Sequence, residues 1–148
     1  MKKSIVIILV IILLLVIVST IGISTKTRKL SAIKQENKQY EQYSKEEIYG
    51  TDVMTLINKA INQNDKNNVS KDEKDNYIDN NQNSITIDII MITDEEKQET
   101  TIYKMETINK VGISEFIANF NTAKFKITKI NYHNQTGRIK HIQITQQY

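Results

Sequence analysis

The chain has no cysteine, no proline and no tryptophan, and only four glycines and two histidines among its 148 residues. Without cysteine it can form no disulfide, no thiolate metal site and no lipid-modified N-terminal cysteine. Without proline it has no rigid Pro-rich linker, and its scattered glycines form no Gly-rich phosphate loop. These absences remove several classes of binding site, and we expect no cofactor.

Common catalytic and metal-binding motifs are also missing. The sequence contains no G-x-S-x-G, H-E-x-x-H, Walker A or G-x-G-x-x-G pattern. The acidic run that starts at Asp65 does not fit a calcium loop, because Val69 and Ser70 stand where an EF-hand needs an oxygen ligand and a glycine. We therefore predict no metal site and a protein that is not an enzyme.

Isoleucine is abundant, with 27 residues against 6 leucines, and lysine and asparagine are frequent. These residues have A/T-rich codons, so the composition indicates the genome of a low-GC Gram-positive bacterium. The formal net charge is only +3. Such a balanced charge argues against nucleic acid as a partner.

An uncharged apolar run, IVIILVIILLLVIVSTIGI, occupies residues 5–23. At ~1.5 Å per residue, a helix of this length matches the ~30 Å hydrocarbon core of a bilayer. A cleaved signal peptide is the alternative, but its apolar region is usually about 7–15 residues and ends at an A-x-A-like site. We predict a retained transmembrane signal-anchor over residues 1–24, with the lipid bilayer as its partner through residues 5–23.

The orientation of this single-pass segment is a separate question. Lys2 and Lys3 precede the apolar run, and several bases follow it from Lys26 onward, so the positive-inside rule is close to a draw. A short N-terminal tail generally stays inside, and long C-terminal domains cross the membrane largely regardless of charge. We expect a cytoplasmic N-terminus and an extracytoplasmic C-terminal domain at the cell membrane.

Residues 25–49 have helix-forming composition and no breaker before Gly50, which predicts a juxtamembrane stalk helix. Leu30, Ile33, Asn37 and Tyr40 follow 3-4-3 spacing and share one face of this helix. The face could pair with a second copy of the chain, with Asn37 setting the register of a coiled coil. It could equally pack on its own domain.

Residues 50–148 are predicted to form an extracytoplasmic α+β domain. Helical spacing of apolar residues predicts a helix over 51–62 that begins at the N-cap Thr51, and Asn62 to Ser84 reads as a polar loop. Alternation predicts a four-stranded antiparallel sheet, and a second short helix is expected over 114–120. The strands are expected at 85–92, 100–105, 124–133 and 138–146, with a turn at 94–97 between the first two.

The last two strands are expected to form a hairpin across residues 134–137. This loop length places His133 opposite Arg138, Tyr132 opposite Ile139, Ile130 opposite His141 and Ile127 opposite Ile144, without a bulge. Tyr132 and Ile139 then lie on the face away from Phe125 and Ile144, and the two histidines lie on opposite faces.

A basic cluster gathers at the tip of this hairpin. Its candidate contact residues for an anion or a partner are Lys129, Tyr132, His133, Arg138 and Lys140. Such a cluster could contact an anionic cell-wall polymer such as teichoic acid, lipid headgroups or a protein partner. Bases on a solvent face also occur for solubility alone.

The layout resembles that of type IV pilins and pseudopilins, which have an apolar N-terminal helix, its amphipathic continuation and a small antiparallel sheet. The resemblance implies assembly into a membrane-rooted filament through the N-terminal helices. Met1-Lys2-Lys3-Ser4 contains no glycine before the apolar run, and Ile5 to Val18 contains no glutamate, so the prepilin cleavage motif is absent.

A looser resemblance is to uncharacterised single-pass membrane proteins of clostridia, through Gly50-Thr51-Asp52-Val53 leading to Ile57. It covers most of the chain and implies no particular activity. The leading interpretation is a membrane-anchored, non-enzymatic binding or assembly module of a bacterial cell surface. A pilin-like subunit that self-associates through its N-terminal helix is the alternative.

Overall fold

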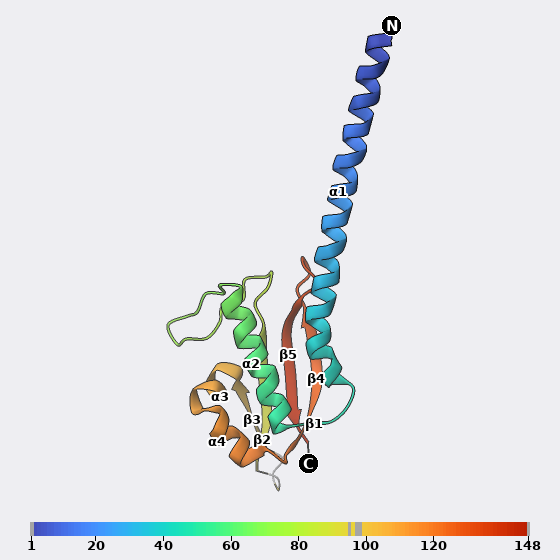
Figure 1. Ribbon diagram of the computed structural model, residues 1–148. Coiled ribbons are helices and arrows are strands. Elements are labelled where there is room, and N and C mark those ends of the chain that lie inside the picture. The colour runs from blue at the N-terminus through green and yellow to red at the C-terminus, as the bar shows by residue number, and fades with distance from the viewer. Residues whose placement is uncertain (1, 95, 97–98, 148) are drawn as a thin grey trace. The chain divides into compact units, whose positions relative to one another are not determined.

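The computed structural model describes residues 2–94, 96 and 99–147, and two of the four residues of the turn predicted at 94–97 fall outside them. The chain divides into two compact units, residues 1–35 and 36–148, which are described separately. Its elements are labelled in Figure 1 and are α1 (Lys2–Glu41), a 3-10 turn (Gln42–Ser44), β1 (Ile48–Tyr49), α2 (Gly50–Lys66), β2 (Thr86–Asp94), β3 (Glu99–Lys104), α3 (Met105–Val111), α4 (Ile113–Phe120), β4 (Lys124–Tyr132) and β5 (Ile139–Gln146).

The first unit is helical and carries the apolar run. Within the described residues, one helix is long and apolar enough to cross a membrane, and none of its apolar window is buried by the rest of the chain. Its side chains from Val10 to Val18 are each between 45% and 66% exposed. This confirms that the N-terminal segment is a helix that could cross a membrane.

The second unit is an α+β domain, as predicted, but its sheet differs from the prediction. The sheet has five strands in the order β1-β4-β5-β2-β3, and it is mixed because β2 and β5 run parallel, with Ile89 opposite Ile144. The prediction of four antiparallel strands was wrong in both respects. Side-chain alternation is the same beside a parallel and an antiparallel neighbour, so the pattern could not reveal this pairing.

The fifth strand, β1, replaces the end of the predicted stalk helix. Helix α1 ends at Glu41 rather than at residue 49, and Ile48 pairs with Phe125 of β4. Both Tyr40 and Ile48 are buried, at 4% and 5% exposed. Burial of these two side chains on the sheet stops the helix, although the local composition would allow it to continue.

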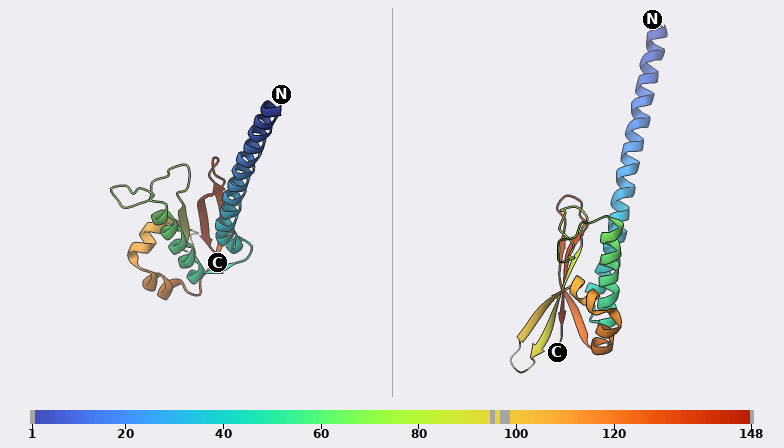
Figure 2. Two further views of the ribbon diagram at one scale, coloured as in Figure 1. Left: turned by 45° about the horizontal axis from the view of Figure 1, so that its top comes forward. Right: turned by 90° about the vertical axis from the view of Figure 1, so that its left-hand side faces the viewer.

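Strand β1 and the hairpins β2–β3 and β4–β5 build the sheet, and three helices cover one of its faces. In Figure 2, α2, α3 and α4 lie on the same side of the sheet, and the opposite face is open. The connection through α3 and α4 carries the chain from the edge strand β3 to β4 on the far side of β2. This crossing places β5 between β4 and β2. Helix α3 was not predicted from the sequence.

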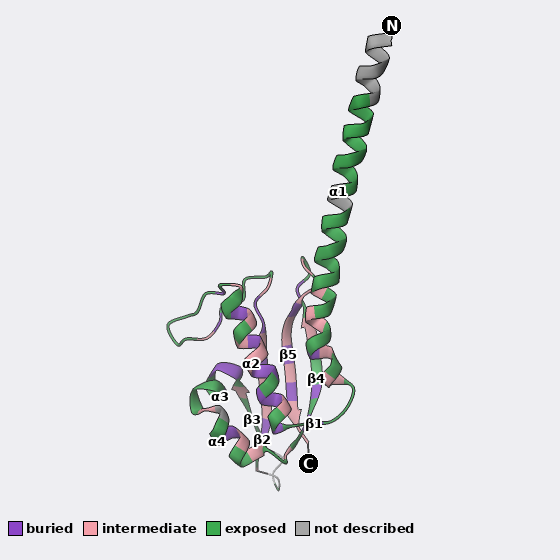
Figure 3. Cartoon of the chain, in the orientation of Figure 1, coloured by how far each residue is buried: buried purple, intermediate pink, exposed green. Residues whose placement is uncertain are grey.

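The core fills the space between the helices and the covered face of the sheet (Figure 3). Alternating residues of β2 and β5 point into it, in agreement with the predicted alternation. Its fully buried side chains include Val53, Leu56, Ile57 and Ala60 of α2, with Ile89, Phe125, Ile142 and Ile144 of the sheet, all 0% exposed.

The β4–β5 hairpin contains two compensating register shifts, where none was predicted. Tyr132 faces Ile139 and Ile127 faces Ile144, as predicted, but Ile130 faces Ile142 rather than His141. One extra residue on each strand produces this offset and then cancels it. The shift beside Lys140 turns Ile139 into the core, where it is 1% exposed, so its predicted position on the other face was wrong.

The predicted polar loop is shorter than expected, because α2 continues to Lys66. Its remaining residues are anchored by two buried side chains, Val69 at 7% and Tyr77 at 6% exposed. The Tyr77 hydroxyl donates a 2.6 Å hydrogen bond to the Asp65 carboxylate. The loop is therefore packed on α2 at both points.

Candidate functional site

The tip of the β4–β5 hairpin is the first candidate site, and its backbone has the predicted four-residue loop. The His133 N–H donates to the Arg138 carbonyl at 2.8 Å, and the Gly137 N–H donates to the His133 carbonyl at 2.8 Å. Gly137 has a positive φ of 71°, which glycine adopts without steric cost. The loop length was therefore read correctly from the sequence.

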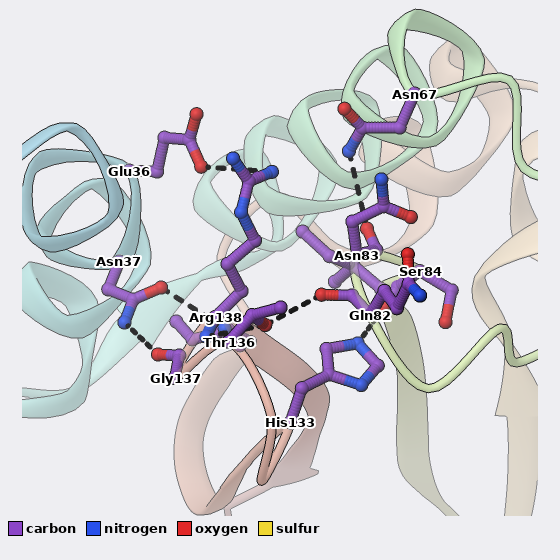
Figure 4. Close-up of polar contacts among 12 residues, drawn as sticks. Glu36, Asn37, Asn67, Gln82, Asn83, Ser84, His133, Thr136, Gly137 and Arg138 are labelled. Atoms are coloured by element: carbon purple, nitrogen blue, oxygen red, sulfur yellow. Dashed lines mark hydrogen bonds and ion pairs between the residues drawn. The ribbon is translucent and has the colours of Figure 1, made fainter. Parts of the chain in front are cut away.

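Most of the predicted contact residues at this tip bind other parts of the same unit, and Figure 4 shows two of them, His133 and Arg138. His133 is 2% exposed, and its Nε2 lies 2.8 Å from the Ser84 carbonyl. An Arg138 guanidinium nitrogen lies 3.4 Å from the Glu36 carboxylate. Lys140 forms a 2.5 Å ion pair with Asp79.

Of the two remaining residues of the cluster, Tyr132 has a hydrogen-bond partner and Lys129 is exposed. The Tyr132 hydroxyl donates a 2.8 Å hydrogen bond to Glu41. Burial, together with this bond, raises the pKa of the Tyr132 phenol. The Lys129 side chain is exposed. Anion binding by this cluster stays a prediction, and an anion would have to compete with the carboxylates of Glu36 and Asp79.

Asn37 is the residue of the predicted stalk face that joins this tip. Its Nδ2 donates to the Gly137 carbonyl at 2.8 Å, and its Oδ1 accepts from the Ile139 N–H at 3.1 Å. Figure 4 shows both bonds on one side chain. Tyr40 is buried in the core of the same unit, whereas Leu30 is 59% exposed and Ile33 is partly exposed. Contact of this face with a second copy stays a prediction.

The loop before β2 completes the arrangement around the tip. The Thr136 hydroxyl donates to the Gln82 carbonyl at 2.7 Å, and Asn67 of α2 donates to the Asn83 carbonyl at 3.3 Å. The tip thus connects the end of α1, the loop before β2 and, through that loop, α2. Its geometry serves to hold these segments together.

Asp79 gives this arrangement a pH dependence. Its hydrogen bond from Lys140, with others from the Asn81 N–H and the Ser84 hydroxyl, lowers the pKa of Asp79 to about 2. An unfolded chain has an Asp pKa of about 3.9, so Asp79 stabilises the fold above about pH 4 and loses that contribution as the pH falls toward 2. The ion-paired side chains are 37% and 39% exposed, so solvent screens the effect.

We expect Asp79→Asn to flatten the loss of stability between about pH 4 and pH 2. The measurement is the midpoint of urea unfolding of the full chain in detergent at several pH values. Glu73→Gln, an exposed carboxylate of the same loop, is the matched control and should keep the wild-type slope. If the stability of Asp79→Asn fell with pH as steeply as that of wild type, the pH dependence could not be attributed to the ion pair of Asp79 with Lys140.

A second candidate site is an open apolar cleft of about 310 Å³ between α3, α4 and strands β2 and β3. The rings of Phe116 and Phe120 of α4 contact each other at a tilt of 39°, with centroids 5.1 Å apart, and both line the cleft. Val111, 55% exposed, lies at its mouth. The polar groups of Thr107, Glu115 and Asn119 also border it.

Sequence reasoning did not find this cleft. A short helix was expected over 114–120, and its apolar side chains Phe116, Ile117 and Phe120 are spaced to share one face of α4. Tyr103 of β3 and Val111 of α3 also line the cleft, and α3 was not expected. The amphipathic spacing on α4 was the available signal, and it does not distinguish a filled core from a cleft.

Metal binding finds no geometric support in residues 2–94, 96 and 99–147, which hold no group of three or more potential ligands. His133 is buried at the tip, while the His141 Nδ1 lies 3.0 Å from the Thr86 hydroxyl. Asp72 accepts hydrogen bonds from the N–H groups of Lys74 and Asn76. The hydrogen bonds from Asn76, and then the one from Lys74, lower the pKa of Asp72, as expected for a carboxylate that caps a turn.

Comparison with known proteins adds no relative to this description. No protein-family model, no curated protein and no solved structure matches the chain.

Proposed function

We propose that this chain is a single-pass membrane protein whose α+β domain acts as a non-enzymatic binding or assembly module outside a bacterial cell. The carrying observation is the uncovered apolar surface of α1, whose side chains from Val10 to Val18 are at least 45% exposed. Apolar surface costs about 25 cal/mol per Å² in water, so a run of this length requires another apolar environment. A bilayer supplies one of matching thickness.

The binding or assembly role rests on surfaces of the second unit. Strand β3 lies at an edge of the sheet, and the apolar cleft opens beside it. Exposed sheet edges and apolar clefts are features through which proteins recognise other molecules. The proposed partner is therefore a protein, with anionic wall polymer or lipid headgroups at the hairpin tip as a further candidate.

The alternative function is a pilin-like subunit, favoured by the continuous helix α1 that leads into a small domain with a sheet. This alternative requires helix–helix contacts of the apolar segment. It therefore implies high-mass assemblies that a Leu14→Lys substitution abolishes. The binding module instead keeps its partner through the second unit.

Orientation is tested by cysteine labelling in intact cells, because the chain has no native cysteine. Asn62, exposed on α2, is a suitable position, and we expect Asn62→Cys to react with a membrane-impermeant maleimide before lysis. Lys3→Cys, which precedes the apolar run, is the matched control and should react only after lysis. Full-length protein should remain in the membrane fraction.

The reverse pattern, with Asn62→Cys protected in intact cells, would place the domain in the cytoplasm and overturn the cell-surface role. A shortened product in the soluble fraction would show cleavage of the N-terminal segment and overturn the anchor.

A further inference from the structure

Strand β3 is an edge strand with one open side. It is hydrogen-bonded to β2 alone within the sheet, and its residues are exposed apart from Tyr103, which is partly buried. An edge strand presents a row of unpaired backbone N–H and C=O groups along its outer side. Figure 2 shows β3 at the outer edge of the sheet.

The residue pattern of β3 is suited to strand pairing. Its sequence, ETTIYK, is rich in β-branched and aromatic residues and contains no proline. The opposite edge of the sheet is different, because β1 covers part of β4 there. Strand β3 is thus the edge at which the described sheet offers a full strand length for pairing.

The apolar cleft opens directly beside this edge. Tyr103 of β3 lines the cleft, and Ile108 and Val111 of α3 lie across it. Alternation along β3 places Glu99, Thr101 and Tyr103 toward the helices, and Thr100, Ile102 and Lys104 toward the open face. A strand added outside β3 would therefore direct alternate side chains to the side on which the cleft lies.

From this juxtaposition we propose that β3 and the cleft bind an extended segment of a partner polypeptide, which extends the sheet and inserts a large apolar side chain into the cleft. Main-chain hydrogen bonds to β3 supply affinity, and the cleft supplies specificity for the side chain. A cleft of about 310 Å³ is at the lower end of ligand pockets and suits one such group. The inference specifies the partner class of the binding role proposed above.

A second copy of this chain fits the edge less well. Antiparallel pairing of β3 with itself about Ile102, with open faces continuous, places Thr101 of the copy opposite Tyr103. Threonine is too small and too polar to fill the cleft. Pairing in the register that places Glu99 opposite Lys104 of the copy satisfies both charges, but it turns the open face of the copy toward the side of the cleft. The complementary partner is an antiparallel strand that keeps the faces continuous, with a base opposite Glu99, an acid opposite Lys104 and an apolar anchor between them.

The test is selection of binders from a random short-peptide library displayed on phage, using the full chain in lipid nanodiscs and empty nanodiscs for counter-selection. We expect enriched peptides to alternate apolar and polar residues around one large apolar side chain. The strongest peptide is then synthesised in two forms, with free amides and with alternate amides N-methylated. N-methylation of the pairing edge should weaken binding by at least about tenfold, because it removes the main-chain donors.

Protein variants test the cleft. Val111→Lys places a charge at its mouth and should also weaken binding by at least about tenfold, since apolar anchors do not tolerate a buried charge. Ile78→Lys is the matched control: Ile78 is 48% exposed, Val111 is 55% exposed, and Ile78 does not line the cleft. Its affinity should stay within about twofold of wild type. Thr107→Trp, a second variant, should block the cleft without a charge.

Absence of enriched peptides, or equal binding by wild type and both cleft variants, would overturn the inference. Equal binding of the N-methylated peptide would overturn the strand pairing. Failure of the cell-surface role is distinguishable, because maleimide labelling reports the orientation of the domain whether or not peptides bind. Peptide binding by a chain whose domain is cytoplasmic would leave this inference standing and move its partner to the cytosol.

Discussion

Gly50→Ala is expected to lower the free energy of unfolding by about 3 kcal/mol, as overpacking against an immobile neighbour does. A Cβ at this first residue of α2 would lie 2.1 Å from the Phe120 carbonyl oxygen and 2.7 Å from its carbon. Both atoms belong to the backbone at the end of α4, so no side-chain rotation relieves the contact. The start of α2 and the end of α4 would have to separate.

The direction of the stability change distinguishes two outcomes for Gly50→Ala. Alanine is a better helix former than glycine by up to about 1 kcal/mol, so without the close approach the substitution would stabilise α2. Urea unfolding of the full chain in detergent, followed by circular dichroism, gives the difference. The N-cap of α2 is Tyr49 rather than the predicted Thr51, which lies inside the helix and is exposed. Thr51→Ala is therefore the control and should change stability by less than about 0.5 kcal/mol. A more stable Gly50→Ala protein would contradict the packing of α2 on α4.

Asn64→Ala should cost about 3 kcal/mol as well, for an electrostatic reason. Asn64 is 0% exposed, and its amide bonds the backbone of Ile85 twice. Its Nδ2 donates to the Ile85 carbonyl at 2.8 Å, and its Oδ1 accepts from the Ile85 N–H at 2.8 Å. Truncation leaves two backbone groups buried without these partners, at about 1–3 kcal/mol each before any water enters.

Asn62→Ala is the matched control for this prediction, since Asn62 is an exposed asparagine on the same helix. Its unfolding free energy should lie within about 0.5 kcal/mol of wild type. Asn64→Asp adds a finer test, because a carboxylate can accept from the Ile85 N–H but cannot donate to its carbonyl. Wild-type stability of Asn64→Ala would show that Ile85 finds other partners.

Gly50 and Asn64 were both assigned the wrong role by a reading of the neighbouring sequence alone. Gly50 was read as a helix terminator, but it stands inside the start of α2 because the Phe120 carbonyl leaves no room for a side chain. Asn64 was placed in a solvated polar loop, but it lies on the buried face of α2. In each case the deciding atoms belong to a segment distant in the sequence.

At the hairpin tip, too, the local sequence indicated some features and distant segments decided the others. Its loop length could be read from residues 134–137, and the pairing of Tyr132 with Ile139 followed from it. The contacts of Arg138 with Glu36 and of Lys140 with Asp79 involve segments that no local pattern relates. The sequence could therefore locate a cluster of basic side chains but could not tell that carboxylates of the same unit lie against them.

By itself, the sequence determined the apolar N-terminal helix and the alternation of most strands, because both depend on the length and period of apolar residues along a short segment. Tertiary structure alone decided the end of α1 at Glu41, the parallel pairing of β2 with β5 and the cleft beside β3. These features arise from pairings between distant segments, and many pairings are compatible with one local pattern. Only the simultaneous packing of helices and strands around one core selects among them.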